Sequence, residues 1–370
     1  MRLRRIAVRR VEMPLRFRFR TSFGETTVKR FLLVEADAGD VSGWGECVAD
    51  DAPLYSEETN ASAAHVLREL LVPAALAKAI DGPEEFSRLV APIRGNRMAK
   101  AALETALWDA AAREKGVRLR DLLGGVRERV PVGVSLGLQP SVEALLELVA
   151  KHVAEKYRRI KLKIEPGRDV ALVSAVRERF PSIDLTVDAN AAYAPGDAPA
   201  LRALDPFGLD YVEQPLGHED LWEHAALARE IATPICLDES ILTARAAADA
   251  IRIGACSIVN VKPGRVGGYL EARRIHDVCV AMGVPVWCGG MLESGIGRAA
   301  NLALAALPGF TLPGDTSASR RYYAEDVTPE FTLAADGTIG VPDGTGIGVE
   351  PVPDALSRLT TSRSWLPAAP

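Results

Sequence analysis

The chain has 370 residues, of which 48% are hydrophobic and 25% are charged. This ordinary globular composition excludes a disordered tail protein and a collagen-like repeat. The formal net charge of −5 argues against a strongly basic surface for nucleic acid, so no nucleic-acid partner is expected. The length favours two domains, or one barrel-sized domain with an addition.

The start of the chain and its cysteines bear on the cellular compartment. Basic residues at the start are not followed by the apolar core of about 7 to 15 residues of a secretory signal. No apolar run approaches the roughly 20 residues of a membrane span. The five cysteines are widely spaced without a CxxC pair, which favours reduced thiols over disulfides or a zinc site. We therefore expect a cytoplasmic protein with no membrane partner.

The N-terminal third combines strand and helix patterns. Residues 4–14 alternate roughly, residues 31–35 form a short apolar run, and a Gly-rich stretch around Gly43 punctuates them. A hairpin or small antiparallel sheet is therefore predicted. Residues 98–114 place small and apolar side chains on one helical face, and Gly116 follows where a helix should end. We predict an α+β domain over residues 1–125.

From residue 130 the pattern becomes a regular series of short β-rich runs and helical stretches. The series contains at least seven strands. Because open doubly wound sheets usually have fewer, an α/β fold with a closed (β/α) barrel is predicted over residues 126–315. Beyond residue 314 the alternation is lost, and residues 316–370 are expected to pack back on the first domain as loops and short strands.

Five polar residues recur at nearly constant spacing along the predicted strands. Lys163, Asp188, Glu213 and Asp238 follow one another at intervals of 25 residues, and Lys262 comes 24 residues later. Each lies in or at the end of a predicted strand. One βα unit of a barrel has about this length, and active sites of such barrels lie at the C-terminal ends of the strands. The five side chains are therefore expected at one mouth of the barrel.

The chemistry of this set indicates a divalent cation. Three converging carboxylates cannot all stay ionised at short range without a compensating charge. A ligand set of oxygens alone favours Mg²⁺, or Mn²⁺ in its place, over zinc. Such an ion can bind a substrate carboxylate and stabilise the charge that forms when its α-proton leaves. A lysine can remove that proton near neutral pH if neighbouring positive charge or burial lowers its pKa. Lys161 and Arg265 are the neighbouring cations of the two lysines.

Simpler interpretations apply to each residue alone. A single acidic residue at a strand end often caps a helix, and a single lysine there is usually a solvated surface group. The even spacing of all five residues argues against both. The histidines have no ligand spacing, Cys236 and Cys288 lack a partnered histidine, and the GRVGG segment matches neither GxGxxG nor Walker A.

At this point the chain resembles the enolase superfamily, in its muconate-lactonising-like subgroup. Within that subgroup it is similar to the o-succinylbenzoate synthase / N-acylamino acid racemase branch. The resemblance extends over nearly the whole chain and is carried by RTSFG (20–24), GWGEC (43–47), LYSEETN (54–60), RIKLKIEPG (159–167), VDAN (187–190), EQPL (213–216), ICLDES (235–240), VNVKPGRVGGYLEA (259–272), WCGGMLESGIGRAAN (287–301) and LPGDTSAS (312–319).

The resemblance implies a fold and a set of roles. The fold is a (β/α)7β TIM-like barrel whose mouth is capped by an α+β domain made of the N-terminal segment and the C-terminal tail. Asp188, Glu213 and Asp238 would bind Mg²⁺ or a substitute divalent ion, and Lys163 and Lys262 would act as acid and base on opposite faces of a small carboxylate substrate. The supporting residues would be Lys161, Arg265, Asn190 and Glu239. The substrate pocket would be lined by Thr21, Ser22, Phe23, Tyr55, Ser135, Gly290, Met291, Glu293, Ser294 and Asp315.

Two reactions share the implied first step, which forms an enediolate. A racemase needs two lysines that each act as acid and base, whereas dehydration to o-succinylbenzoate needs one such lysine and one that stays charged. Arg265 beside Lys262 would help that lysine to be neutral part of the time, which favours racemisation. We therefore expect both reactions, in menaquinone biosynthesis or amino-acid metabolism, from a homo-oligomer.

Three alternatives stay open at this stage. A dipeptide epimerase or a muconate-type cycloisomerase would use the same five residues with different cap loops. A mandelate-racemase-like enzyme is disfavoured because Lys262 stands where a His–Asp dyad is needed. A non-catalytic metal-binding barrel is expected to have lost at least one of the five residues.

Overall fold

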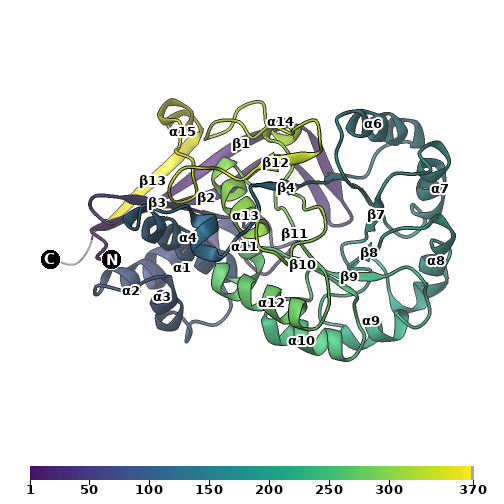
Figure 1. Cartoon of the computed structure of the whole chain (residues 1–370), viewed down its shortest axis with the longest axis horizontal. Coiled ribbons are helices and arrows are strands. Elements are labelled where there is room, and N and C mark those ends of the chain that lie inside the picture. Colours follow the sequence, from purple (N-terminus) through teal and green to yellow (C-terminus); the bar gives the residue numbers. More distant parts are fainter. Residues whose placement is uncertain (368–370) are drawn as a thin grey trace.

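The computed structural model describes residues 1–367 and is built around two large sheets (Figure 1). The first sheet is antiparallel with the strand order β13-β1-β2-β3. It confirms the strands predicted near the N-terminus. The last three residues of the predicted C-terminal segment lie outside the described residues. The strands of this sheet are β1 Arg5–Thr21, β2 Gly24–Asp37, β3 Ser42–Cys47 and β13 Thr360–Pro367.

Helices pack on the antiparallel sheet, and the longest of them is the one predicted from the sequence. Helix α4 runs over Arg97–Glu114, and Gly116 follows it with a φ of +66°. The helices of this region are α1 Asn60–Val66, a π-helical turn Leu67–Leu71, α2 Val72–Leu76, α3 Pro83–Leu89, α4 and α5 Leu119–Leu123.

The Gly-rich stretch around Gly43 confirms the predicted hairpin. Its first part forms the turn between β2 and β3, where the N–H of Ala38 donates to the carbonyl of Val41 at 3.0 Å, and its second part is β3, against which α4 lies directly. A Cβ atom on Gly43 would lie 2.0 Å from the carbonyl oxygen of Ala106, and one on Gly45 would lie 1.9 Å from that of Ala102. These glycines are therefore required by the close approach of a helix to a strand.

The second sheet is parallel, and its seven strands neighbour one another in chain order from β5 to β11. Figure 1 shows the sheet curling, with helices along its outer side. The strands are β5 Val134–Leu136, β6 Ile160–Lys163, β7 Leu185–Asp188, β8 Val212–Glu213, β9 Ile235–Leu237, β10 Ile258–Val261 and β11 Val286–Cys288. The helices that follow β5 to β11 are α6 Val142–Ala154, α7 Val170–Arg179, α8 Ala198–Arg202 with 3₁₀ turns at Pro195–Asp197 and Asp205–Phe207, α9 Leu221–Leu227, α10 Ala244–Arg252, α11 Pro263–Val266, α12 Tyr269–Ala281 and α13 Gly295–Ala305.

An irregular segment, residues 310–315, completes the ring between the last and the first strand of the parallel sheet. On one side the backbone N–H of Asp315 donates to the carbonyl of Cys288 in β11 at 2.9 Å. On the other side the N–H of Gly133, just before β5, donates to the carbonyl of Gly314 at 2.7 Å. Seven regular strands and this segment form the predicted (β/α)7β barrel.

The C-terminal part of the chain returns to the N-terminal sheet. Strand β13 pairs antiparallel with β1, so that the yellow and purple strands lie side by side in Figure 1. The boundaries predicted at residues 125 and 315 stay predictions. The remaining elements are β4 Arg129–Pro131 and β12 Thr338–Gly340, which pair with each other, and the helices α14 Ser319–Tyr322 and α15 Pro353–Leu359.

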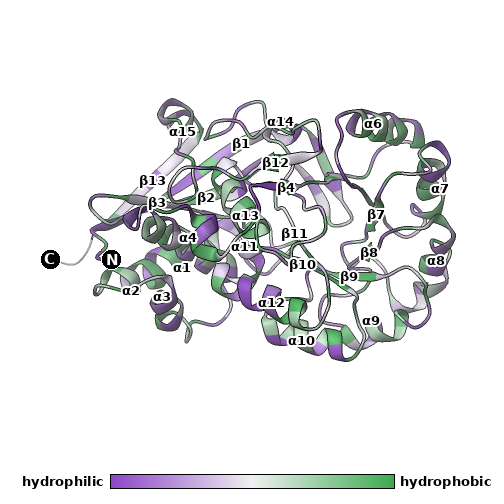
Figure 2. Ribbon diagram, in the orientation of Figure 1, coloured by the Kyte–Doolittle hydropathy of each residue, from purple (hydrophilic) through white to green (hydrophobic). Residues whose placement is uncertain are grey.

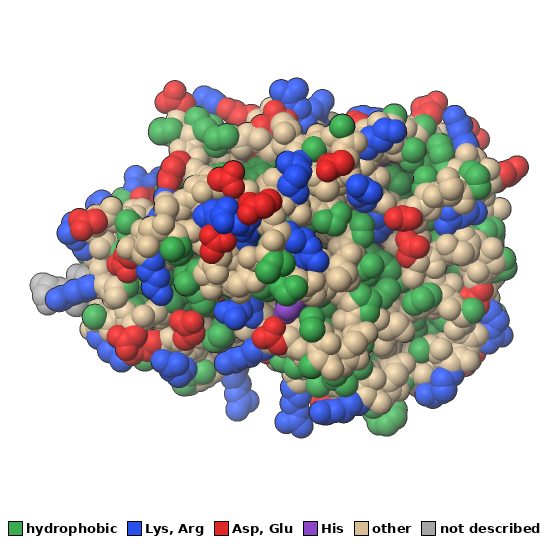
Figure 3. Space-filling view, in the orientation of Figure 1, with side chains coloured by type: hydrophobic (Ala, Val, Ile, Leu, Met, Phe, Trp, Pro, Cys, Tyr) green, Lys and Arg blue, Asp and Glu red, His purple; other side chains and the backbone are tan. Residues whose placement is uncertain are grey.

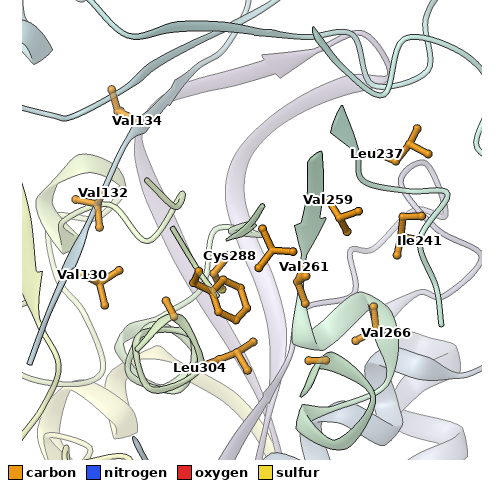
Figure 4. Close-up of a cluster of buried hydrophobic side chains, with 14 of the residues drawn as sticks. Val130, Val132, Val134, Leu237, Ile241, Val259, Val261, Val266, Cys288 and Leu304 are labelled. Atoms are coloured by element: carbon orange, nitrogen blue, oxygen red, sulfur yellow. The ribbon is translucent and has the colours of Figure 1, made fainter. Parts of the chain in front are cut away.

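One hydrophobic core lies between the barrel strands and the elements around them, and a second lies between the N-terminal sheet and its helices. In Figure 4, side chains from β10, from the strands near β5 and from α13 meet around Cys288. In Figure 2 the short barrel strands β8 and β9 are green, whereas β13 of the N-terminal sheet is nearly white. The labelled core residues are Val130, Val132, Val134, Leu237, Ile241, Val259, Val261, Val266, Cys288 and Leu304.

The surface carries charges of both signs. Figure 3 shows acidic and basic side chains interspersed over one face of the molecule. Among residues 1–367 there is no helix with the length and apolar character that a membrane crossing requires.

A buried carboxylate joins the N-terminal sheet to the barrel. Glu46 of β3 accepts hydrogen bonds from the hydroxyl of Ser294 at 2.5 Å, from the Ser294 N–H at 3.1 Å and from the Gly297 N–H at 3.0 Å. These donors form the N-terminus of α13. Burial raises the pKa of Glu46 from its ordinary 4.5 to about 7, and the nearby Glu293 contributes to the increase.

Replacing Glu46 with glutamine is expected to flatten the pH dependence of stability. In the unfolded chain this carboxyl ionises above pH 4.5, whereas in the folded chain it keeps its proton to about pH 7. The free energy of unfolding should therefore fall as pH rises between these values, by up to about 1.4 kcal/mol per pH unit from this group. Urea unfolding at several pH values measures the slope. An unchanged slope in Glu46→Gln would contradict the assignment, and Glu69→Gln, at an exposed position, is the control.

Candidate active site

The parallel strands bring the five evenly spaced residues to one end of the barrel. Lys163, Asp188 and Glu213 are the last residues of β6, β7 and β8, while Asp238 and Lys262 directly follow β9 and β10. The register pairs Lys163 with Asp188, and Asp188 with Glu213. The common position arises because each residue ends a parallel strand of the same sheet, as the spacing predicted.

Within this group, each carboxylate faces a lysine ammonium group. Lys163 Nζ lies 2.6 Å from Asp188 Oδ2, and Lys262 Nζ lies 2.6 Å from Asp238 Oδ2. Lys161 Nζ lies 2.7 Å from Glu213 Oε2. All of these side chains are buried, and each carboxylate has a lysine within ion-pair distance.

The three carboxyl groups respond differently to this environment. Burial raises the pKa of Glu213 to about 8, and the charges of Asp188 and Asp238 add to the increase. Burial also opposes ionisation of Asp188, but Lys163 and Lys161 outweigh it and lower the pKa of that carboxyl. The negative charges around Glu213 are therefore not fully compensated by the lysines.

The residues present fit a divalent cation in their chemistry. In the described chain no three His, Cys, Asp or Glu side chains already converge as a metal-binding group, because the carboxylates turn toward lysines. The donors are oxygens on neighbouring strands, and the pKa of Glu213 is raised first by burial and further by the charges of Asp188 and Asp238, which a cation would offset. Nearby, Oε2 of Glu239 is buried without a hydrogen-bond partner. Asn190, whose amide donates to Glu239 Oε1 at 3.0 Å, also accepts a hydrogen bond from Lys163.

Lys262 is paired with a carboxylate and has its pKa shifted by several neighbours. Burial lowers its pKa, but Asp238 and Tyr55 raise it more, so that the pKa lies well above its usual value. Arg265 lowers the pKa of Lys262, as expected, yet its guanidinium group pairs directly with Asp238 and so also compensates that carboxylate. The direct contact with Asp238 favours the charged form of Lys262.

Lys161 is held by the predicted residue Asp315 and by Trp287, which the sequence analysis did not single out. Its Nζ lies 2.7 Å from Asp315 Oδ2 and 4.7 Å from the ring centre of Trp287. Arg159, two residues before Lys161, pairs with Asp315 and lies over the same Trp287 ring at 4.7 Å. The alternation of residues 159, 161 and 163 along one strand could have indicated that Arg159 also points into the barrel.

Gln214 is a second residue that the sequence analysis missed. It is fully buried with a φ of +37°, in the left-handed region. Its side-chain oxygen accepts hydrogen bonds from the N–H groups of Asp238 at 3.1 Å and Ser240 at 3.2 Å. Because a non-glycine residue in this region costs about 1–3 kcal/mol, the surrounding structure must hold it there. Gln214 thus positions the loop that carries Asp238.

Two N-terminal loops cover the barrel mouth, as the resemblance implied. The phenol of Tyr55 donates to Asp238 Oδ1 at 3.1 Å and accepts from Lys262 Nζ at 3.0 Å. The hydroxyl of Ser22 donates to the carbonyl of Ala189 at 3.3 Å, and the rings of Phe23 and Tyr55 lie 6.3 Å apart. Residues from two distant segments therefore close over the strand ends.

These parts enclose a cavity that contains most of the predicted pocket residues. It is also lined by residues that the sequence analysis did not name, among them Phe19, Lys29, Leu292 and Tyr322. The predicted residues that line it are Thr21, Phe23, Tyr55, Ser135, Lys161, Lys163, Asp188, Asn190, Lys262, Gly290, Met291 and Asp315.

Three predicted pocket residues do not line this cavity. Ser22 contacts the backbone after β7. Ser294 is the N-cap of α13, and its hydroxyl is bound to Glu46. Glu293 accepts a hydrogen bond from the amide of Asn301 at 2.9 Å. Ser294 and Glu293 belong to a strand-end loop, as predicted. Their polar atoms, however, form hydrogen bonds with β3 and with α13.

The comparisons with known proteins agree with this geometry. Residues 4–124 match the N-terminal domain of the mandelate racemase / muconate lactonizing enzyme family, and residues 144–355 match the enolase C-terminal domain-like family. An N-succinylamino acid racemase from Amycolatopsis is 56% identical over 99% of this chain and its own full length. An o-succinylbenzoate synthase from Geobacillus stearothermophilus is 51% identical, covering 93% of this chain and 92% of that protein.

Solved structures support the same relationship. An enolase-superfamily protein from Listeria innocua has a TM-score of 0.96 and 42% identity, with both chains covered completely. An N-succinyl Arg/Lys racemase from Bacillus cereus has a TM-score of 0.91 and 25% identity over 99% of this chain and 100% of that one. The barrel, the cap and these full-length matches lead to one conclusion: the chain belongs to the enolase superfamily.

Proposed function

We propose that this protein removes the proton α to a carboxylate and thereby catalyses two reactions, racemisation of N-succinylamino acids and dehydration to o-succinylbenzoate. The observation that carries the proposal is the position of two lysines. Lys163 and Lys262 line the same cavity, from the two ends of the row of strands that carries the carboxylates. The full-length relatives named for these two activities support both reactions.

The metal of the proposal is Mg²⁺, with Mn²⁺ as a substitute. Members of this superfamily generally use a divalent metal. Asp188, Glu213 and Asp238 would hold the ion, with Asn190 and Glu239 beside them. When bound, the ion supplies a positive charge for the substrate carboxylate and for the negative charge that develops on it. Binding the ion would also take the carboxylates away from the lysines that now neutralise them.

The lysines then carry the proton. Freed from Asp188, Lys163 accepts the α-proton on one face of the substrate, while Lys262 donates a proton to the opposite face in racemisation. In dehydration a single lysine both removes the α-proton and protonates the leaving hydroxyl, and Lys262 stays charged. Positive charge from Lys161 and Arg265 favours the neutral form of each neighbouring lysine.

Residues from the cap orient the substrate and exclude water. Tyr55 and Phe23 close the cavity over the strand ends, and Met291 adds an apolar wall. A closed, largely apolar cover strengthens the electrostatic interactions inside it. This arrangement suits a substrate with an acidic end at the carboxylate row and a larger group under the cap.

The test of the proposal uses the purified protein with Mg²⁺ in deuterated water. N-succinyl and N-acetyl amino acids are followed by NMR for exchange of the α-proton and by polarimetry for loss of optical rotation, beside a dehydration assay on the o-succinylbenzoate precursor. Exchange with racemisation supports the two-lysine mechanism, and dehydration alone assigns Lys262 as a fixed cation. Silence in both assays would overturn the proposal and favour a dipeptide or lactone substrate.

Replacing Glu213 with glutamine is expected to weaken Mg²⁺ binding. The variant removes one of the three carboxylates that would hold the ion. Loss of a residue that only supports a metal ligand typically lowers metal affinity by about 10- to 100-fold, so losing a ligand should lower it by at least that factor. Isothermal titration calorimetry measures it directly. Glu219→Gln, in the exposed loop after the same strand, should bind like the parent. Unchanged affinity in Glu213→Gln would remove Glu213 from the ligand set.

We further propose the domain boundaries at residues 125 and 315, a homo-oligomeric assembly and a cytoplasmic location. Limited proteolysis should cut first near the two boundaries, and light scattering coupled to gel filtration should give a mass above that of one chain. A single-chain mass at micromolar concentration would contradict the assembly.

A further inference from the structure

A second and larger cavity lies outside the catalytic one. It has a volume of about 900 Å³ and is bounded by the β1–β2 hairpin, by α6 and by residues 318–333. The hairpin and α14 separate the two cavities. Arg20 and Arg321 line the large cavity, whereas the residues that follow each of them, Thr21 and Tyr322, line the catalytic one. Figure 1 shows α6 and α14 as the helices of this region.

The large cavity is strongly cationic in a protein whose net charge is −5. The acidic side chains that line it are Glu25 and Glu155, and Glu330 just outside the lining lies 2.7 Å from one of the arginines. His152 is neutral near pH 7, because burial and Arg321 lower its pKa to about 4. The basic residues of the lining are Arg16, Arg18, Arg20, Lys151, Arg320 and Arg321.

Arg321 is the observation that points to a ligand. Its side chain is about nine-tenths buried, and in residues 1–367 no carboxylate lies within ion-pair distance of it. One hydrogen bond leads to the carbonyl of Ser135 at 3.0 Å, and its Nε has no partner. The guanidinium lies 4.0 Å from the ring centre of Phe17. Because a buried cation without a counter-charge is costly, the site is complementary to an anion.

Arg320 is paired with Glu330, but two arginines of the hairpin are weakly neutralised. Arg18 lies 3.6 Å from Glu25 with a side chain that is 79% exposed. Arg16 donates only to a backbone carbonyl, that of Arg320, at 3.2 Å. Five arginines and one lysine favour phosphate, because the planar guanidinium group binds its oxygens in a bidentate manner.

The walls of the cavity add an apolar component. Phe17, Leu148, Tyr157 and Leu333 contribute aromatic and aliphatic surface beside the basic groups. A volume of this size is typical of sites for small organic ligands. The combination suits a ligand with a phosphate group at one end and a ring or apolar group at the other.

We propose that this cavity is a second ligand site, which binds a phosphate monoester of nucleotide size on the side of the β1–β2 hairpin away from the catalytic cavity. The phosphate would contact the arginines of the hairpin and Arg321, and the ring would lie against the apolar walls. The site does not depend on the activity proposed above.

The probe for this site is adenosine monophosphate, titrated calorimetrically into the Mg²⁺-loaded protein. It should bind, adenosine should not, and raising the salt concentration should weaken the binding. Arg18→Glu should raise the dissociation constant at least about tenfold, as Arg320→Glu should, because each reverses a charge of the lining. The matched control is Arg245→Glu, whose side chain is 92% exposed and lies 3.6 Å from an acidic partner on α10. It should change the constant less than twofold.

Several outcomes would overturn the proposal. These are no binding at millimolar adenosine monophosphate, equal binding of adenosine, or equal losses in Arg18→Glu and Arg245→Glu. Lys163→Ala should bind the probe like the parent. Loss of binding in that variant would place the probe in the catalytic cavity and would also overturn the proposal. Because none of these measurements requires turnover, failure here is distinguishable from failure of the proposed activity.

Discussion

Replacing Lys163 with alanine is expected to lower kcat/KM by about 10²- to 10⁴-fold in both racemisation and dehydration, the usual contribution of a general base. The variant should fold, because Asp188 keeps Lys161 as a partner, with Nζ 3.2 Å from its Oδ2. Binding of Mg²⁺ should persist, because no proposed ligand is changed. Initial rates of both reactions, together with calorimetric titration of Mg²⁺, measure the three quantities.

The control for this experiment is Lys115→Ala, a loss of the same charge at an exposed position. Near-normal turnover in Lys163→Ala would show that another group removes the proton. Loss of Mg²⁺ binding together with activity would mean that Lys163 maintains the structure of the carboxylate row, and the assignment as base would then lack support.

Replacing Lys262 with alanine is expected to abolish proton transfer on one face of the substrate and to retain it on the other. Racemisation should fall by about 10²- to 10⁴-fold, because it needs a proton donor on each face. Lys163 remains, so one enantiomer should still exchange its α-proton for deuterium without losing its configuration. The buried Asp238 keeps Arg265 as its partner, so the fold should be retained. NMR of each enantiomer in deuterated water gives the result.

Exchange of both enantiomers at equal rates in Lys262→Ala would contradict the two-face mechanism. Continued racemisation would do so as well. Lys115→Ala again serves as the control for loss of one positive charge. The comparison of dehydration in the same variant then reports whether the charge of Lys262 contributes to that reaction.

Lys163 and Lys262 are two of the lysines that contact the carboxylate row. Both lysines are in contact with carboxylates, and the pKa of Lys262 is raised well above its usual value. Arg265 compensates Asp238 as well as repelling Lys262. The net charge of the site therefore depends on which cations pair with the carboxylates. The order of residues along the chain does not specify these pairs.

Most of the barrel and the five-residue row could be predicted from the sequence. The βα repeat has a nearly constant length, and parallel strands end at the same edge of the sheet. Local pattern alone thus places Asp188, Glu213 and Asp238 together. Local pattern did not indicate why Gly43 is required, because its close contact with Ala106 joins a strand to a helix that lies far along the chain.

The interactions that hold the site together required the tertiary structure. Glu46 and Ser294 are 248 residues apart and meet only because the N-terminal sheet docks on the barrel. The unneutralised Arg321 lies beside the hairpin for the same reason. The sequence by itself determined the repeat, the strand ends and the kind of chemistry available there. Only the tertiary structure decided which charges are paired. Pairing depends on the distances between segments that are far apart in the chain, and the local repeat of strands and helices does not determine those distances.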